Sequence, residues 1–429
     1  MITDRIQREY YLDCIVRNMW NGEVKVITGI RRCGKSVLLF ELFYAYLLQK
    51  GVQEDEIITI ELDQRKYYAY RNPVALCEYV ESIVTKDKQK NFYLFIDEVQ
   101  LTTKAVDTKN GNVEVTIYDM LNELKAYQNL DVYVTGSNSK ALSKDIATEF
   151  RGRASQIHVY PLSFSEYYAF AGGDAQKALE QYMLYGGMPR VVQIKDERDK
   201  KQYLTQLYQE VYIKDIVERY HIERADIMND ILDYLASQVS SLTNASNIAN
   251  ALTSMRHESV NSVLVASYVS YAVDAFLIQE ARRYDVKGKS YFSYPNKYYY
   301  SDLGLRNARL NYRQYDPGHI MENIIYNELI RRGYSVDVGV VTDRKNGSKT
   351  QKEVDFVVND HDRRIYIQSA FRMDAQTAKE NAELRSLMLT GDFFKKIVIR
   401  MDIPHNYYDD NGIFHCNLLD FLLERVTLF

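Results

Sequence analysis

Eight residues near the N-terminus have the types and spacing of a phosphate-binding loop. GIRRCGKS, residues 29–36, matches the pattern G-x-x-x-x-G-K-[ST]. Glycines in such a loop let the backbone approach the phosphates, and amides at the start of the next helix point at them. Lys35 is expected to reach the β- and γ-phosphates, and the Ser36 hydroxyl to bind Mg²⁺. The residues expected around the phosphates are Gly29, Ile30, Arg31, Arg32, Cys33, Gly34, Lys35, Ser36 and Val37.

The flanking sequence places this loop between a strand and a helix. VKVIT, residues 24–28, is apolar and β-branched, which predicts a buried strand. SVLLFELFYAYLLQKG, residues 36–51, has helical length and ends at a glycine suited to a helix C-cap. A strand before the loop and a helix after it are the context that phosphate binding requires. A glycine turn without function is the alternative.

A pair of acidic residues supplies the second half of the expected chemistry. NFYLFIDEVQ, residues 91–100, predicts an apolar strand that ends at Asp97 and Glu98. Asp97 is suited to hold Mg²⁺ through water, and Glu98 to polarise the attacking water. The loop and the acidic pair together predict a nucleoside-triphosphate hydrolase.

Six ordered motifs resemble those of one group of prokaryotic AAA+-like P-loop ATPases, whose members carry a C-terminal region related to restriction endonucleases. The motifs are GIRRCGKS (29–36), FIDEVQ (95–100), VTGSNSKAL (134–142), FRGRASQIHVYPLSFSEY (150–167), YGGMPRVV (185–192) and VYIKDIVERYHI (211–222). The resemblance covers most of the chain. It implies that the nucleotide is ATP, with Mg²⁺ held by Ser36 and Asp97.

The resemblance implies an α/β fold in three parts. Residues 1–162 are expected to form the AAA+-like P-loop ATPase core, a parallel sheet of five strands with helices on both faces and the P-loop strand at its centre. Residues 163–305 would form a helical lid, capped at its start by Ser163, and a winged-helix region. Residues 306–429 would form an α/β domain like that of restriction endonucleases.

Two further pairs of residues are candidates for sensing the γ-phosphate. The strand of residues 130–135 is followed by Ser137 and Asn138, and in AAA+ ATPases a polar residue at this point contacts that phosphate. We prefer Asn138, with a turn that has polar neighbours as the alternative. Arg151 and Arg153 flank a glycine before the next strand, where an arginine can stabilise the developing charge. Ordinary surface arginines are the alternative there.

The middle of the chain predicts a winged helix. Residues 244–252 and 258–278 suggest two helices joined by a turn, and residues 281–302 suggest a hairpin that closes on Lys287-Gly288. The expected recognition helix, residues 258–271, contains no lysine or arginine, so charged contacts to DNA are expected from the wing instead. Those wing residues are Arg282, Arg283, Lys287, Lys289 and Lys297. A structural or protein-docking role is the equal alternative.

The C-terminal part resembles a PD-(D/E)xK nuclease core with residues replaced. A helix from residue 319, a strand with Asp355 and a further strand follow in the expected order, and Glu322 or Glu328 is the candidate helix acid. The [D/E]-x-K position reads Gln368-Ser369-Ala370, so the second carboxylate and the lysine are missing. No geometric argument supports Lys379 as a substitute for the lysine of that motif. We therefore expect a degenerate nuclease fold without cleavage activity.

Composition and charge favour a reducing cytoplasm and no membrane. There are 54 basic and 58 acidic side chains, a net charge of −4, so any DNA-binding surface must be local. The four cysteines are scattered and have no histidine cluster, so neither disulfides nor zinc are expected. The N-terminus lacks an apolar secretory segment.

These patterns favour an ATPase whose nucleotide state moves the winged-helix and nuclease-like regions, with DNA, a protein or a second copy of the chain as partner. A nucleotide-gated switch that binds DNA or protein with little turnover is the alternative. An ATP-dependent nuclease is disfavoured because Gln368 and Ala370 replace the residues that cleavage needs.

Overall fold

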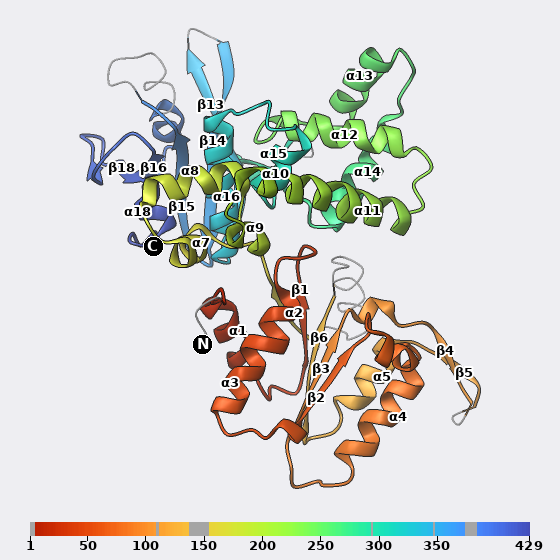
Figure 1. Ribbon diagram of the computed structural model, residues 1–429. Helices are drawn as coiled ribbons and strands as arrows, with labels where there is room; N and C mark the ends of the chain where they lie inside the picture. Colours follow the sequence, from red (N-terminus) through yellow and green to blue (C-terminus); the bar gives the residue numbers. More distant parts are fainter. Residues whose placement is uncertain (1–4, 109–110, 137–153, 293–294, 346–347, 374–383) are drawn as a thin grey trace. The chain divides into compact units, whose positions relative to one another are not determined.

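The computed structural model describes residues 5–108, 111–136, 154–292, 295–345, 348–373 and 384–429. By their contacts these residues form two compact units. Unit 1 comprises residues 1–161 with Asp274–Phe276, and unit 2 comprises Leu162–Val273 with Leu277–Phe429. Each unit is described by itself (Figure 1).

Unit 1 is an α/β unit built on a five-stranded parallel sheet with the strand order β2-β3-β6-β1-β7. Its elements are α1 (Glu9–Arg17), β1 (Val24–Thr28), α2 (Lys35–Val37), the π-helical segment η1 (Leu38–Phe43), α3 (Tyr44–Gln49), η2 (Glu54–Glu56), β2 (Ile57–Glu61), η3 (Arg65–Arg71), α4 (Pro73–Val84), β3 (Phe92–Asp97), η4 (Val99–Leu101), β4 (Ala105–Asp107), β5 (Val113–Val115), α5 (Ile117–Leu124), β6 (Leu130–Thr135) and β7 (Ala154–His158).

Both faces of this sheet are covered by side chains of the flanking helical segments. The strands β1, β3 and β6 are buried along their whole length, as expected when helices pack on both sides of a parallel sheet. One face packs against α4 and α5, and on the other the ring of Phe43 packs against Phe95 and Tyr133. The expectation that the P-loop strand lies at the centre is wrong by one position: β6 is the middle strand, because β7 adds beyond β1.

Unit 2 begins with helices and continues into two sheets (Figure 1). Its elements are α7 (Phe164–Ala171), α8 (Ala175–Tyr185), α9 (Pro189–Gln193), α10 (Glu197–Gln206), the π-helical segment η5 (Leu207–Ile213), α11 (Lys214–Arg219), α12 (Ala225–Ser237), β8 (Leu242–Thr243), α13 (Ala245–Arg256), α14 (Ser262–Asp274), β9 (Ile278–Ala281), β10 (Arg283–Asp285), β11 (Ser290–Tyr291), β12 (Asn296–Tyr300), α15 (Leu303–Arg309), α16 (Pro317–Arg331), β13 (Ser335–Lys345), β14 (Ser348–Asp360), β15 (Arg363–Ala370), β16 (Lys395–Arg400), β17 (Tyr407–Tyr408), β18 (Phe414–Asn417) and α18 (Leu418–Leu422).

The helices α12, α13 and α14 lie in the same stretch of chain as a small antiparallel sheet of order β8-β12-β9, whose strand β8 lies between α12 and α13. The winged helix stays a prediction. The predicted hairpin differs from the structure in one respect. Strands β9 and β12 pair with each other, but the segment between them forms a second hairpin, β10 and β11. That second hairpin joins another sheet, as the edge partner of β13.

The larger sheet of unit 2 has eight strands in the order β11-β10-β13-β14-β15-β16-β18-β17. Helix α16 packs against it and against β12, and Tyr299 of β12 stacks on Tyr326 of α16 with ring centroids 4.0 Å apart. The side chains of Tyr298, Tyr299 and Tyr300 are all buried. This tyrosine run therefore serves core packing.

The first helix of unit 2 begins as predicted. The Ser163 hydroxyl accepts a hydrogen bond from the backbone N–H of Glu166, and the Glu166 carboxylate accepts one from the N–H of Ser163. This reciprocal pair is a capping box, which satisfies amide groups at the helix start. Among the residues that the structure describes, no helix combines the length and apolar character needed to cross a bilayer.

Candidate functional site: the phosphate loop and its acidic partners

The phosphate loop follows β1 directly and is shaped by its glycines. Gly29 has φ 146°, and a Cβ atom there would lie 2.2 Å from the carbonyl oxygen of Val159. Gly34 has φ 100°, in a region that other residues avoid. Both positions therefore require glycine. The loop is followed by the helical segments α2, η1 and α3, as the sequence predicts, and this helical stretch ends before Gly51, which has φ 91°.

Lys35 is buried at the start of this helix, and its ammonium group turns back over the loop. Its Nζ donates to the carbonyl oxygens of Gly29 (3.0 Å) and Ile30 (3.1 Å). The other predicted loop residues divide by exposure. Ile30 and Cys33 are buried, whereas Arg31, Arg32 and Val37 are exposed. Cys33 donates from Sγ to the carbonyl of Val159 (3.2 Å), so its side chain anchors the loop to the segment that follows β7.

Asp97 lies at the carboxyl end of β3 and is joined to the loop by hydrogen bonds. Its carboxylate accepts from the hydroxyls of Thr135 and Ser36. Burial raises the pKa of Asp97, and these two hydrogen bonds oppose that rise only in part. A hydroxyl and a poorly neutralised carboxylate are the hard oxygen donors that Mg²⁺ prefers, so Ser36 and Asp97 fit the predicted cation.

Glu98 directly follows Asp97 and has an unusual backbone conformation. Its φ of 55° and ψ of 49° are left-handed, which turns the chain sharply at the end of β3. Its N–H donates to the Thr135 hydroxyl (3.2 Å), and its carboxylate accepts from Nε2 of Gln100. Glu98 is therefore held beside Asp97 at the edge where nucleotide is expected.

Two functional candidates were missed in the sequence. Thr135, the last residue of β6, bonds to both Asp97 and Glu98, and in the sequence it served only to mark the strand's end. Glu61, the last residue of β2, pairs in register with Asp97, and burial raises its pKa. A polar residue closing an otherwise apolar strand was the available signal for both.

Two residues of neighbouring segments, the buried Arg8 and the partly buried His158, contact the loop and the strand before it. The Arg8 guanidinium donates to the carbonyl oxygens of Cys33 (3.0 Å) and Tyr160 (2.7 Å). His158 lies beside Thr28, with 3.2 Å between Nδ1 and the Thr28 hydroxyl oxygen. Burial and the nearby Lys35 lower the pKa of His158 to about 3, so its imidazole is neutral near pH 7. Neither residue stood out in the sequence.

Four of the predicted residues cannot be placed. Ser137, Asn138, Arg151 and Arg153 lie outside the described residues. Their proposed contacts with the γ-phosphate stay predictions.

The predicted DNA-contacting residues of unit 2 do not all lie on the surface. Arg282, Lys287 and Lys289 are exposed, and the Arg282 guanidinium lies over the ring of Tyr291 (4.5 Å). Arg283 is buried and donates to Gln351 (2.9 Å), and Lys297 is buried among carboxylates. Including Arg283 and Lys297 in a DNA-binding wing was therefore wrong, because the strands that carry them pack inside the unit.

Three of the residues predicted for a nuclease core lie close together in unit 2, at a site called the polar centre below. Glu322 of α16, Asp355 of β14 and Gln368 of β15 are all buried and line a cavity of about 280 Å³. Glu328, the other candidate acid, instead pairs with Arg331 and Arg332. Lys379 lies outside the described residues. Lys297 of β12, which the sequence assigned to the wing, lies at this centre.

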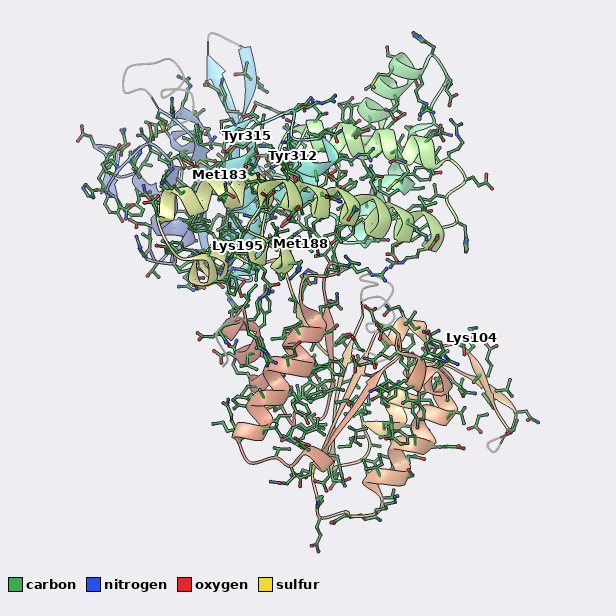
Figure 2. All side chains as sticks on the ribbon, viewed as in Figure 1. Lys104, Met183, Met188, Lys195, Tyr312 and Tyr315 are labelled. Carbon is green, nitrogen blue, oxygen red and sulfur yellow. The ribbon has the colours of Figure 1, made fainter. Side chains whose placement is uncertain are left out.

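A second cavity of unit 2 has a mixed lining and no predicted role. Its volume is about 720 Å³, and Met183 of α8 and Tyr315, both labelled in Figure 2, line it together with Phe371 and Met401.

In unit 1, the side chains of Cys77, Glu81 and Glu123 bring their possible metal-ligand atoms close together. Burial and the carboxylates raise the pKa of Cys77 to about 12, so the thiol stays protonated and is a poor metal ligand.

Comparison with known proteins agrees with this geometry. A family model described as "AAA domain" matches residues 21–168, and one described as "Domain of unknown function (DUF8612)" matches residues 176–316. The Walker-type ATPase PABY2304 of Pyrococcus abyssi has a similar fold, with a TM-score of 0.50 and 16% sequence identity over 72% of this chain and 96% of that one.

Two relatives extend over most of the chain. "Uncharacterized protein MJ1544" of Methanocaldococcus jannaschii is 28% identical over 411 residues, which are 88% of this chain and 85% of the relative. An "Uncharacterized protein" of Haemophilus influenzae is 32% identical over 427 residues, 98% of this chain and 99% of the relative. The chain therefore belongs to one family with the Haemophilus influenzae protein, and its N-terminal part is an AAA domain with the fold of Walker-type ATPases.

Proposed function

We propose that this protein binds ATP with Mg²⁺ and hydrolyses it. The observation that carries the proposal is that the hydroxyls of Ser36 and Thr135 both donate to the Asp97 carboxylate, beside the loop that holds Lys35 and next to Glu98. Asp97 and Thr135 end the strands β3 and β6, and Lys35 and Ser36 begin α2 after β1, at the carboxyl edge where α/β proteins bind nucleotides.

Each of these side chains has a distinct role in the proposed reaction. The loop amides and Lys35 bind and orient the phosphates, and Lys35 exchanges its two carbonyl partners for phosphate oxygens. Ser36 and Asp97 would hold Mg²⁺, which supplies neutralising charge when bound. Glu98 accepts a proton from the attacking water, and the Thr135 hydroxyl joins the Asp97 carboxylate to the backbone N–H of Glu98.

We extend the proposal to coupling between nucleotide state and unit 2. The exposed Arg282, Lys287 and Lys289 support contact with a nucleic-acid backbone, which is a short-range electrostatic interaction. The recognition-helix candidate α14 supports a protein partner instead, since it has no basic residue and Val263 on it is 70% exposed.

The test is steady-state ATP hydrolysis by the purified chain, with and without duplex and single-stranded DNA. Lys35→Ala is expected to abolish ATP binding, because Lys35 is the loop residue whose ammonium is expected to bind the β- and γ-phosphates. Lys50→Ala is the matched control, since Lys50 is exposed at the other end of the same helix. Stimulation by DNA that disappears in Arg282→Ala/Lys287→Ala/Lys289→Ala supports a DNA partner, and turnover indifferent to DNA favours a protein partner.

A nucleotide-gated switch with little turnover is the second candidate. The hydrogen bond from Gln100 to the Glu98 carboxylate favours it, because a base held by a neighbouring amide is less ready to accept a proton. Tight ATP binding without multiple turnovers, with or without DNA, would support the switch. Gln100→Ala would then raise turnover, whereas in an active ATPase the same change would leave turnover unchanged or lower it.

A further inference from the structure

Three carboxylates surround the ammonium group of Lys297 in unit 2. Its Nζ lies 2.8 Å from Oε1 of Glu322, 2.5 Å from Oε1 of Glu353 and 3.7 Å from Oδ1 of Asp355. The three acids come from two elements, α16 and β14, while the lysine comes from β12 of the small sheet. A single cation is thus shared by three acids that the chain brings together from distant positions.

The position of this group makes its positive charge essential. The Lys297 side chain is 4% exposed, and those of Glu322 and Asp355 are 10% and 9% exposed. Three carboxylates close to one another repel unless a cation lies among them, and the Lys297 ammonium occupies that position.

Two of these acids, Glu322 and Asp355, are the residues that the sequence pattern assigns to a metal-binding nuclease centre. Other groups of the centre also bond to these two acidic residues. The side-chain carbonyl of Gln368 accepts from the backbone N–H of Asp355 (3.2 Å), and the second carboxylate oxygen of Asp355 accepts from the N–H of Ser369 (2.8 Å). The hydroxyl of Tyr299 also donates to Oε1 of Glu322 (2.7 Å).

We infer that Lys297 is a built-in substitute for the divalent cation of this centre, so that the C-terminal region of unit 2 is independent of metal. The ammonium lies among the carboxylate oxygens that an ion would otherwise contact. It also ties β12 of the winged-helix-like region to α16 and β14, which makes the substitution a structural link as well.

Lys297 is not a relocated catalytic lysine. A catalytic lysine must present a donor to water or substrate, whereas this ammonium has two short contacts and a third ion pair to carboxylates. The inference therefore also predicts that the wild-type centre does not cleave DNA.

The inference predicts a latent cation site that appears when the lysine is removed. A cavity of about 280 Å³ lined by Glu322 and Asp355 already adjoins the centre, so an ion has room to enter after Lys297→Ala. The experiment uses the nucleotide-free full chain in an Asp97→Asn background, which removes the cation ligand of unit 1. Thermal unfolding is followed with and without 1 mM MnCl₂ as the probe. This concentration is roughly a hundredfold above the Kd of a site that binds Mn²⁺ with a Kd of about 10 μM.

The expected result has three parts. The Asp97→Asn parent shows no change in Tm with Mn²⁺. Lys297→Ala lowers the Tm without metal, and Mn²⁺ raises it again by roughly 5 °C. Adding Asp355→Asn abolishes that rise. The matched control is Lys289→Ala, an exposed lysine of the same segment, which should change neither the Tm nor the response to Mn²⁺.

Either of two outcomes overturns the inference. One is a parent protein whose Tm rises with Mn²⁺ in a manner that depends on Asp355, since metal and lysine would then coexist. The other is a Lys297 variant that ignores Mn²⁺, whether or not it has lost stability. If Lys297→Ala does not fold, Lys297→Ala/Glu353→Gln has one uncompensated acid fewer and carries the same test. If that variant also requires Mn²⁺ during expression to become soluble, the inference is supported.

Discussion

At the scale of single residues, Thr135 links the two acidic residues of the proposed nucleotide site. Its one hydroxyl donates to the Asp97 carboxylate and accepts from the Glu98 backbone, so it links the cation ligand to the proposed base. A side chain in this position acts on the reaction through the two acids it orients, and groups of this kind commonly change metal affinity or activity by about 10–100-fold.

Thr135→Val tests that linkage, because valine has nearly the shape of threonine without its hydroxyl. We expect ATP turnover to fall by about 10–100-fold, and the Mg²⁺ concentration for half-maximal turnover to rise. Titration of turnover with MgCl₂ measures both effects. Thr59→Val, a partly buried threonine on the neighbouring β2, is the control. A variant with the parental Mg²⁺ dependence would show that Thr135 has only a packing role.

Glu98→Gln tests the proposed base. The amide keeps the size of the side chain but accepts protons poorly, so we expect turnover to fall by about 10²–10⁴-fold while ATP binding stays within a few-fold of the parent. Single-turnover hydrolysis and equilibrium binding separate the two quantities. Glu114→Gln on the exposed strand β5 should change neither. Hydrolysis at the parental rate would mean that another group activates the water.

At the scale of elements, the YGGMP segment (residues 185–189), which joins α8 to α9, packs closely against the start of α15. The N–H of Gly187 donates to the Asp302 carboxylate (2.7 Å), which also caps α15 through the N–H of Leu305 (3.1 Å). Burial raises the pKa of Asp302 to about 6, although backbone hydrogen bonds oppose the rise. This segment, one of the six motifs that carry the family resemblance, therefore holds the helices of unit 2 together.

Gly187→Ala is expected to destabilise unit 2 by about 1–3 kcal/mol, the usual cost of overpacking a well-packed site. An added Cβ would lie 2.3 Å from the carbonyl oxygen of Leu162 and 3.0 Å from the Tyr182 ring. Urea unfolding measures the loss. Gly318→Ala is the control, since its Cβ would meet only Asp316 Oδ1 at 3.4 Å in the first turn of α16. Equal stabilities for the two variants would contradict the close approach.

At the scale of the whole molecule, the second hairpin changes how unit 2 is expected to behave. Strand β10 lies between β9 and β12 in sequence but pairs with β13 in the larger sheet, where the N–H groups of Val286 and Val338 donate to Val340 and Arg282. The three-domain division of the chain stays a prediction. From this pairing we expect β10, β9 and β12 to move together with the larger sheet of unit 2.

Hydrogen exchange of the full chain tests this behaviour. If β10 is an integral strand, the amide of Val286 should exchange as slowly as the amides of β12, because both need unit 2 to open. Adding ATP should then change protection in the two segments together. Fast exchange at Val286 beside slow exchange in β12 would describe an independent wing.

Local patterns predicted the conformation of the phosphate-binding loop. An apolar strand, a loop with Gly29 and Gly34 in glycine conformations and a helix from Lys35 follow in the expected order, and the roles of these residues toward a nucleotide stay predictions. The same reasoning could not assign Thr135, because its role depends on β6 lying between β3 and β1 in the sheet. Strand order is set by packing and long-range pairing, which leave no trace in a local window.

The sequence by itself determined the chemistry that unit 1 offers to a nucleotide, because every residue of that loop lies within one short segment whose conformation is locally encoded. It also predicted, from Gln368 and Ala370, that the C-terminal part does not cleave DNA. Only the tertiary structure decided that Lys297 belongs with Glu322 and Asp355 rather than on a DNA-binding wing. A buried charge needs a partner wherever the fold can supply one, and which partner arrives is known only when distant strands and helices meet.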